Sequence, residues 1–299
     1  MAEDNEMQAR LVVDSRCEIG ESPLWDAARR ALFWVDIPAG TVFRLDVATG
    51  AIRSWRFDAP VGSLGLARSG RLLVAVGGEV LLLDIDTDAR QRLAMVESRF
   101  PEFRLNDGKV GPDGAFWVGS MHDVAPNEQR PEACLYRVSA DGRVERKIDR
   151  LKVSNGLAWT ADGRTLFHTD SRGPWIDRWD FDPSTGALSG RRRLRDLSEA
   201  EGRPDGGACD IAGLYWSCGV SAGCLNGFDG DGQLVRKIAL PLPAPTMPCF
   251  AGEGLTTLYL TSLHKGLPAE KLAAAPASGG VLALEFPVAG VPVGLFEDA

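Results

Sequence analysis

The chain has 299 residues, of which 44% are hydrophobic and 25% charged, the balance of a soluble globular protein. A net charge of −8 without a basic stripe argues against nucleic acid as a partner, and no run approaches the roughly 18 apolar residues of a membrane span. The polar start MAEDNEMQAR does not resemble a signal peptide. We therefore expect a cytoplasmic protein, monomeric by default, with reduced thiols rather than a Cys218–Cys224 disulfide.

Taken in chain order, the predicted elements repeat. A short apolar run recurs six times at intervals of 40, 43, 51, 48 and 44 residues, as LFWVD, LLVAV, AFWVG, LFHTD, LYWSC and LYLTS, beginning at Leu32, Leu72, Ala115, Leu166, Leu214 and Leu258. A glycine-rich segment and a turn precede each run, and most runs are followed by a second strand pattern and a charged third one. A period of about 40 to 45 residues is the length of a four-stranded propeller blade.

The repeat predicts an all-β fold, a six-bladed β-propeller around a central channel. We expect residues 11–299 to form this single domain after an extended or disordered tail over residues 1–10. Helical patterning is confined to PAEKLAAAP at 268–276. Either LVVDSRC near the N-terminus or VPVGLFED near the C-terminus completes the last blade, and both stay open. A β-sandwich is the alternative fold, but it does not explain the repeat.

We count back nine residues from the first residue of each apolar run, or eleven where the intervening turn is two residues longer. In a propeller, the six positions reached in this way would be equivalent and would lie at one height in the channel. Four of them carry a carboxylate or carboxamide. Such groups converging in a narrow channel need a cation between them, and oxygen ligands suit calcium, magnesium, manganese or iron. Taken singly, Asn-Gly and Asp-Gly are more often turns than ligands. The positions are Glu21, Ser63, Asn106, Asn155, Asp205 and Cys249.

Four ordered segments resemble the senescence-marker-protein/gluconolactonase family, which includes regucalcin and bacterial sugar lactonases. They are GESPLWD (20–26), RLNDGKVGPDGAFWVGSM (104–121), SNGLAWTADGRTLFHTDS (154–171) and RPDGGACDIAGLYWSC (203–218). The resemblance implies a six-bladed propeller with one divalent metal in the channel. Its metal ligands would fall on Glu21, Asn155 and Asp205.

The same resemblance implies that Arg104 and Asn106 bind substrate beside the metal. The stretch Met121 to Asp123 resembles sugar-acid lactonases more than regucalcin, so His122 and Asp123 are expected substrate contacts. A further substrate-binding glutamate of regucalcin has no match in this sequence. The insertion MHDVAPNEQRPEA, within the longest repeat interval, is where we expect substrate choice to be decided.

These expectations describe a metal-dependent lactonase acting on a small sugar lactone, with calcium, zinc, manganese or iron(II) as the cofactor. The metal would polarise the lactone carbonyl and activate a water, and Asp205 would be both ligand and general base. No G-x-S-x-G or G-x-G-x-x-G motif points to a serine hydrolase or a nucleotide cofactor. The alternatives are a calcium-dependent phosphotriesterase-like hydrolase and a non-catalytic propeller with a structural ion. An open ligand position would distinguish catalysis from structure.

Overall fold

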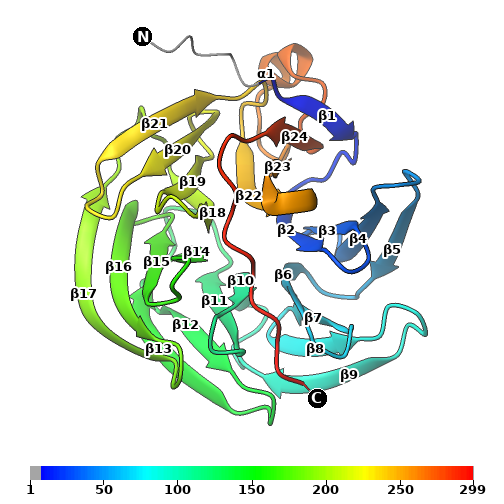
Figure 1. The fold of residues 1–299 in the computed structure, drawn as a ribbon, viewed down its shortest axis with the longest axis vertical. Helices are drawn as coiled ribbons and strands as arrows, with labels where there is room; N and C mark the ends of the chain where they lie inside the picture. Colours follow the sequence, from blue (N-terminus) through cyan, green and yellow to red (C-terminus); the bar gives the residue numbers. More distant parts are fainter. Residues whose placement is uncertain (1–7, 299) are drawn as a thin grey trace.

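The computed structural model describes residues 8–298, which form six four-stranded antiparallel sheets arranged as a ring (Figure 1). This confirms the predicted six-bladed β-propeller. In each of blades 1 to 5 the strands follow one another in chain order from the channel outward. The expected tail over residues 1–10 lies outside the described residues as far as residue 7, and Arg10 begins the first strand.

Each blade extends from an innermost strand at the channel to an outermost strand at the rim. In that order, blade 1 holds β2 (Gly20–Asp26), β3 (Ala31–Asp36), β4 (Thr41–Asp46) and β5 (Ile52–Arg56). Blade 2 holds β6 (Val61–Leu66), β7 (Leu72–Val76), β8 (Glu79–Leu83) and β9 (Arg90–Met95). Blade 3 holds β10 (Phe103–Val110), β11 (Phe116–His122), β12 (Ala133–Val138) and β13 (Val144–Leu151). Blade 4 holds β14 (Ser154–Trp159), β15 (Thr165–Asp170), β16 (Trp175–Asp182) and β17 (Ala187–Asp196). Blade 5 holds β18 (Pro204–Cys209), β19 (Tyr215–Gly219), β20 (Cys224–Phe228) and β21 (Leu234–Ala239). Blade 6 holds β22 (Pro245–Ala251), β23 (Thr257–Ser262), β24 (Val281–Glu285) and β1 (Arg10–Val13).

The N-terminal segment closes the ring, because β1 pairs with β24 as the outer strand of blade 6, with Arg10 opposite Ala283. The other candidate, VPVGLFED, has a different role. It crosses one end of the channel from blade 5 to blade 2 (Figure 1), where Val291 N–H donates to the Cys209 carbonyl at 2.9 Å and Phe296 N–H to the Leu66 carbonyl at 2.8 Å.

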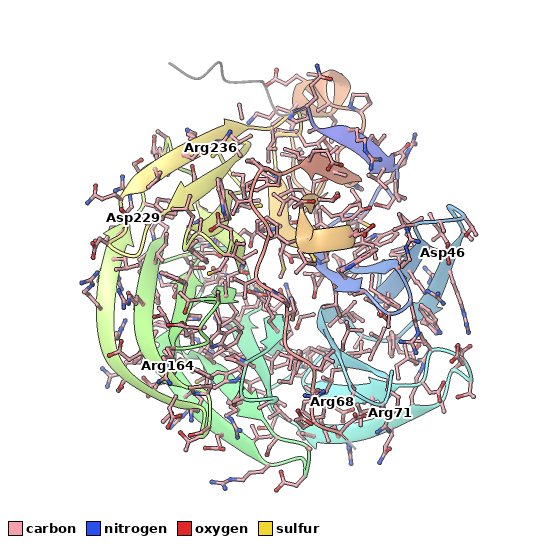
Figure 2. All side chains as sticks on the ribbon, viewed as in Figure 1. Asp46, Arg68, Arg71, Arg164, Asp229 and Arg236 are labelled. Carbon is pink, nitrogen blue, oxygen red and sulfur yellow. The ribbon has the colours of Figure 1, made fainter. Side chains whose placement is uncertain are left out.

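Apolar side chains fill the spaces between blades, and charge lies at the rim. The second strand of blade 1 is buried throughout, and the Trp117 ring meets Phe181 of the next blade at 5.5 Å between centroids. The labelled side chains Asp46, Arg164 and Arg236 lie at the periphery (Figure 2). The short helix α1 (Ala269–Ala274) falls inside the predicted stretch, and η1 (Glu253–Leu255) is a single 3-10 turn. Within residues 8–298, no helix has the length and apolarity to cross a bilayer.

All six cysteines are buried and unpaired, so Cys218 and Cys224 form no disulfide within the described residues.

Every innermost strand carries an irregularity in its pairing, and in five of them two residues lie opposite one residue of the next strand. Such bulges re-aim side chains. The Asn155-Gly156 dipeptide lies in one of them, not in a hairpin turn. Gly156 has φ 67°, and a Cβ there would come within 2.5 Å of the Tyr215 hydroxyl, so glycine is required.

One of the six counted positions is wrong. Glu21 and Asn155 each oppose the fourth residue of their apolar run, Val35 and Thr169, whereas Cys249 opposes Tyr259, the second. The reason is the turn before the sixth run, which contains η1 and is longer than the count allowed. Cys249 therefore lies farther along the channel, away from the other acidic and amide side chains.

Candidate metal and substrate site

Three side chains meet at the floor of a cavity of about 120 Å³ at one end of the channel. Glu21 comes from β2, Asn155 from β14 and Asp205 from β18, each at the beginning of its strand. The Asn155 amide donates to Asp205 Oδ1 at 2.5 Å and to the Ser171 hydroxyl at 3.1 Å. Glu21 Oε2 accepts from the N–H of Ser22 at 2.6 Å. Three residues from three blades thus share one floor, as the repeat predicts.

The two carboxyl groups of the floor lie in surroundings that disfavour their charged forms. Burial raises the pKa of Glu21 well above its ordinary value, and the nearby charges of Asp205 and Asp107 raise it further. The pKa of Asp205 is raised to about 7, first by burial, although Arg203 opposes the shift. Two carboxyl groups that resist ionisation side by side are the electrostatic pattern of a cation site.

Asp107 is a third carboxylate at this level, which the sequence reasoning missed. Its Oδ2 accepts from Leu157 N–H at 3.1 Å, while its buried Oδ1 has no partner within the described residues. Burial raises its pKa, and the ammonium of Lys109 lowers it. The motif Asn106-Asp107-Gly108 contained the signal, since a bulge aims adjacent side chains differently.

The residues present fit a divalent metal of the oxygen-loving class. Within residues 8–298, no three His, Cys, Asp or Glu side chains converge as a ligand set by themselves, so the Asn155 amide is needed as the third donor. Glu21, Asn155 and Asp205 supply hard oxygen atoms around one small space, and the unpartnered Oδ1 of Asp107 adds negative potential beside them.

One wall of the cavity is a hydrogen-bonded chain. Arg104 Nε donates to Asp123 at 3.0 Å, and its Nη1 donates to Asn106 Oδ1 at 3.0 Å. The Asn106 amide in turn donates to the Ser154 carbonyl at 3.0 Å. Arg104 is buried, and this burial lowers its pKa while the charge of Asp123 opposes the change. The wall therefore presents a fixed guanidinium and amide to whatever lies above the floor.

The chain is similar to known proteins over most of its length. A family model described as SMP-30/Gluconolactonase/LRE-like region matches residues 19–264. The chain belongs to this family. A protein named 6-deoxy-6-sulfogluconolactonase from Pseudomonas putida is 36% identical over 288 residues, covering 96% of this chain and 98% of the relative. Regucalcin from Bos taurus is 32% identical, covering 96% and 97%.

A solved structure is similar as well. A calcium-binding protein, regucalcin, from Agrobacterium tumefaciens superimposes with a TM-score of 0.91 at 25% identity, covering 97% of this chain and 98% of the other. The similarity extends over all six blades of this SMP-30/gluconolactonase-family chain. The expected family resemblance is thus confirmed.

His122 does not reach the cavity. Its ring stacks on Phe103 with 4.5 Å between centroids, and its Nδ1 accepts the Arg130 N–H at 3.0 Å. His122 lines neither the floor cavity nor the wider pocket above it. Asp123, by contrast, lines the wider pocket and holds Arg104.

The floor cavity opens into an outer pocket of about 830 Å³. The predicted insertion forms part of its wall through Val124, Pro126 and Gln129. Gln129 also lines the floor cavity, and its Oε1 is buried without a partner within the described residues. Sequence reasoning missed Gln129, because nothing local distinguishes it from a surface glutamine.

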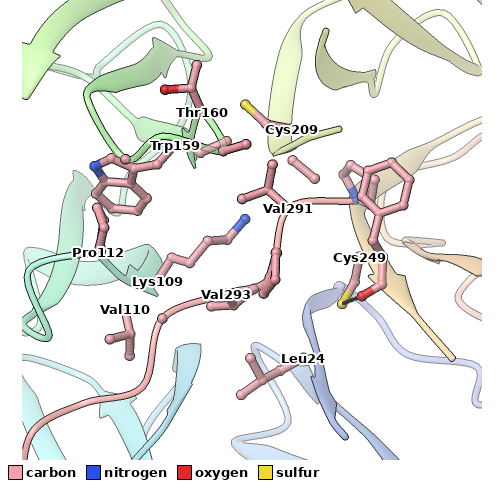
Figure 3. Close-up of a pocket in the computed structure, with 18 of the residues that line it drawn as sticks. Leu24, Lys109, Val110, Pro112, Trp159, Thr160, Cys209, Cys249, Val291 and Val293 are labelled. Atoms are coloured by element: carbon pink, nitrogen blue, oxygen red, sulfur yellow. Dashed lines mark hydrogen bonds between the residues drawn. The ribbon is translucent and has the colours of Figure 1, made fainter. Parts of the chain in front are cut away.

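A second cavity, of about 310 Å³, lies at the other end of the channel, beneath the C-terminal crossing (Figure 3). Its lining is mostly apolar and includes Cys249 and Val291. Lys109 extends into it and donates to the Gly207 carbonyl at 2.7 Å. Since Lys109 also lowers the pKa of Asp107, this ammonium lies between the acidic floor and the apolar cavity.

Proposed function

We propose that this protein is a metal-dependent hydrolase that opens a sugar lactone to the sugar acid. The observation that carries the proposal is the acidic floor of Glu21, Asn155 and Asp205 beneath a wall that presents Arg104 and Asn106. The sulfogluconolactonase among the relatives supports a lactone substrate, and the calcium-binding regucalcin supports a divalent cation.

Glu21, Asn155 and Asp205 would hold the cation, with calcium, zinc, manganese and iron(II) as the alternatives. A cation bound there supplies a polarised carbonyl and a water of lowered pKa. The chain's own residues do the rest. Asp205 accepts a proton from the attacking water, whose oxygen bonds to the carbonyl carbon. The ring carbon–oxygen bond then breaks, and the proton passes from Asp205 to the departing ring oxygen.

The wall residues orient the sugar. The Nη2 of Arg104 makes no hydrogen bond with residues 8–298, so it is free to donate to a hydroxyl or to the developing oxyanion. Its other donors are occupied by Asp123, Asn106 and the Leu105 carbonyl, which fixes the plane of the guanidinium. Each donor aimed at a hydroxyl favours sugar lactones over plain ones.

The test is metal removal and replacement. The protein is stripped with a chelator, supplied with calcium, zinc, manganese or iron(II), and assayed for acid release from a panel of aldonolactones. We expect at least one metal to restore hydrolysis well above the spontaneous rate. No hydrolysis with any metal would refute the proposal, and hydrolysis of a phosphotriester alone would support the phosphotriesterase alternative.

Asp205→Asn keeps the shape of the side chain and removes its charge. We expect turnover to fall by at least 100-fold, the scale of a lost general base. Asp86→Asn on the exposed surface is the matched control and should retain turnover. Thermal melting of both variants separates a loss of chemistry from a loss of folding.

We also propose that the protein works as a monomer in the cytoplasm. Six unpaired, buried cysteines are compatible with a reducing compartment. Size-exclusion chromatography with light scattering tests the monomer, and a dimer mass would contradict it.

A further inference from the structure

Two arginine side chains at the mouth of the site have no partner among residues 8–298. Arg172 lies in the turn after β15, and Arg203 lies immediately before β18. Both line the floor cavity and the outer pocket. Across residues 8–298, neither guanidinium forms an ion pair or donates a hydrogen bond, and the Nε of Arg203 is buried without a partner.

Several other partly buried arginines in residues 8–298 are paired, although the Nε of Arg44 is not. Arg137 Nε lies 2.7 Å from Asp113, and Arg195 Nε lies 2.6 Å from Glu201. Leaving a guanidinium without a partner while it loses solvent is costly. Burial lowers the pKa of Arg172, and the positive charge of Arg203 lowers it further. Two like charges are therefore held near each other at the substrate's entrance.

The outer pocket is positive although the chain carries a net charge of −8. Among the described residues, Asp123 is the only carboxylate in its lining, and Arg104 occupies it. A divalent cation on the floor would take up the charge of Glu21 and Asp205 and leave the two arginines uncompensated. The cations that line the pocket are Arg104, Arg172, Arg203, Lys265 and Lys271.

We propose that Arg172 and Arg203 bind an anionic substituent of the substrate, so that the enzyme prefers sugar lactones that carry a carboxylate, sulfonate or phosphate group. The proposal rests on the lactonase function proposed above. Guanidinium groups suit such anions because their donors match the spacing of the anionic oxygens. The chemistry that these three substituents share is an oxyanion with at least two oxygen atoms that accept hydrogen bonds.

A simpler role for these arginines is to favour the charged form of Asp205, whose pKa both of them lower. That role would affect every lactone alike. Anion recognition instead affects charged lactones more than neutral ones, so the readout is the ratio of the two kcat/KM values.

The test compares glucono-1,5-lactone with three charged lactones: glucaro-1,4-lactone, 6-phosphoglucono-1,5-lactone and 6-deoxy-6-sulfoglucono-1,5-lactone. We expect the wild type to prefer at least one charged lactone over the neutral one by more than 10-fold. In Arg172→Gln and Arg203→Gln that preference should fall by roughly 10- to 100-fold, the effect of losing a charge-assisted hydrogen bond. Arg203→Lys should recover part of it. Arg236→Gln, at the periphery (Figure 2), is the matched control.

The outcomes separate the two proposals. Hydrolysis of the neutral lactone with no preference for charge, or a preference that Arg172→Gln and Arg203→Gln leave intact, would overturn the arginine proposal and leave the lactonase function standing. No hydrolysis of any lactone would overturn the function. Calorimetric titration with glucarate and gluconate then decides the arginine proposal without turnover: tighter glucarate binding that Arg203→Gln removes supports it, and equal binding overturns it.

Discussion

His168 makes the fold sensitive to acid. Its ring is fully buried in β15, with Nε2 2.9 Å from the Ser154 hydroxyl and Nδ1 without a partner within the described residues. Burial, and to a lesser extent the charge of Arg191, lowers its pKa to about 3. Ser154 also carries the carbonyl that holds Asn106, so a proton on His168 would disturb the support of the site.

The sign and size of the effect follow from proton linkage. Below pH of about 6.5 the unfolded chain protonates this histidine and the folded chain does not, so stability is present above that pH and is lost as pH falls toward 3. The loss is about 1.4 kcal/mol per pH unit, or about 3 kcal/mol at pH 4.5. Glu21 and Asp205 act in the opposite direction, because their raised pKa values favour the folded state on acidification.

The assay is urea unfolding at pH 7 and pH 4.5, in chelator, for the wild type, His168→Gln and His264→Gln. The carboxyl contributions are common to all three proteins and cancel in the comparison. We expect His168→Gln to lose about 3 kcal/mol less than the wild type between the two pH values, whereas His264→Gln, at a partly exposed position, should follow the wild type. Equal losses for the wild type and His168→Gln would refute the reasoning.

Three further predictions concern the two ends of the channel. Calcium at 100 times its dissociation constant should raise the unfolding free energy of the wild type by about 3 kcal/mol, and calorimetric scans of Glu21→Gln should show no such rise. Phe296→Ala should lower the free energy of unfolding, measured with a chemical denaturant, by about 3 to 5 kcal/mol, because the ring is fully buried in the C-terminal crossing. It should leave KM unchanged. Leu295 is 41% exposed, so Leu295→Ala should lower the free energy of unfolding by less than about 1 kcal/mol. Gln129→Leu should raise KM for gluconolactone roughly 5- to 10-fold through the loss of one hydrogen bond, and more than KM for δ-valerolactone, which has no hydroxyls; Gln233→Leu, on the surface, should change neither value.

The blades could be predicted because each repeat contains one strand that is buried on both faces. The run Ala31–Asp36 is buried along its whole length, so it reads as a continuous apolar segment. The closing strand could not be chosen in this way. Leu11 is 46% exposed in β1, while Phe296 is fully buried in a segment that forms no strand, so apolarity alone favours neither segment.

The residues of the floor could be predicted from the sequence because the repeat aligns Glu21, Asn155 and Asp205. The alignment went wrong at Cys249, where the turn containing η1 changes the count. Arg172 and Gln129 could not be predicted as site residues, since both come from loops whose direction depends on packing between blades. Within the described residues, the guanidinium of Arg172 and the Oε1 of Gln129 have no partner, and this feature is visible only in three dimensions.

The central claim is that the acidic floor holds one cation that is needed to open a lactone. Its most direct test is acid release from glucono-1,5-lactone while the chelator-stripped protein, at a concentration above the dissociation constant, is titrated with the cation that restores the most activity. The account predicts a rate that rises from the spontaneous value and levels off at one equivalent for the wild type, and stays at the spontaneous value for Asp205→Asn. Full activity before any cation is added, or an unchanged titration curve in Asp205→Asn, would contradict it.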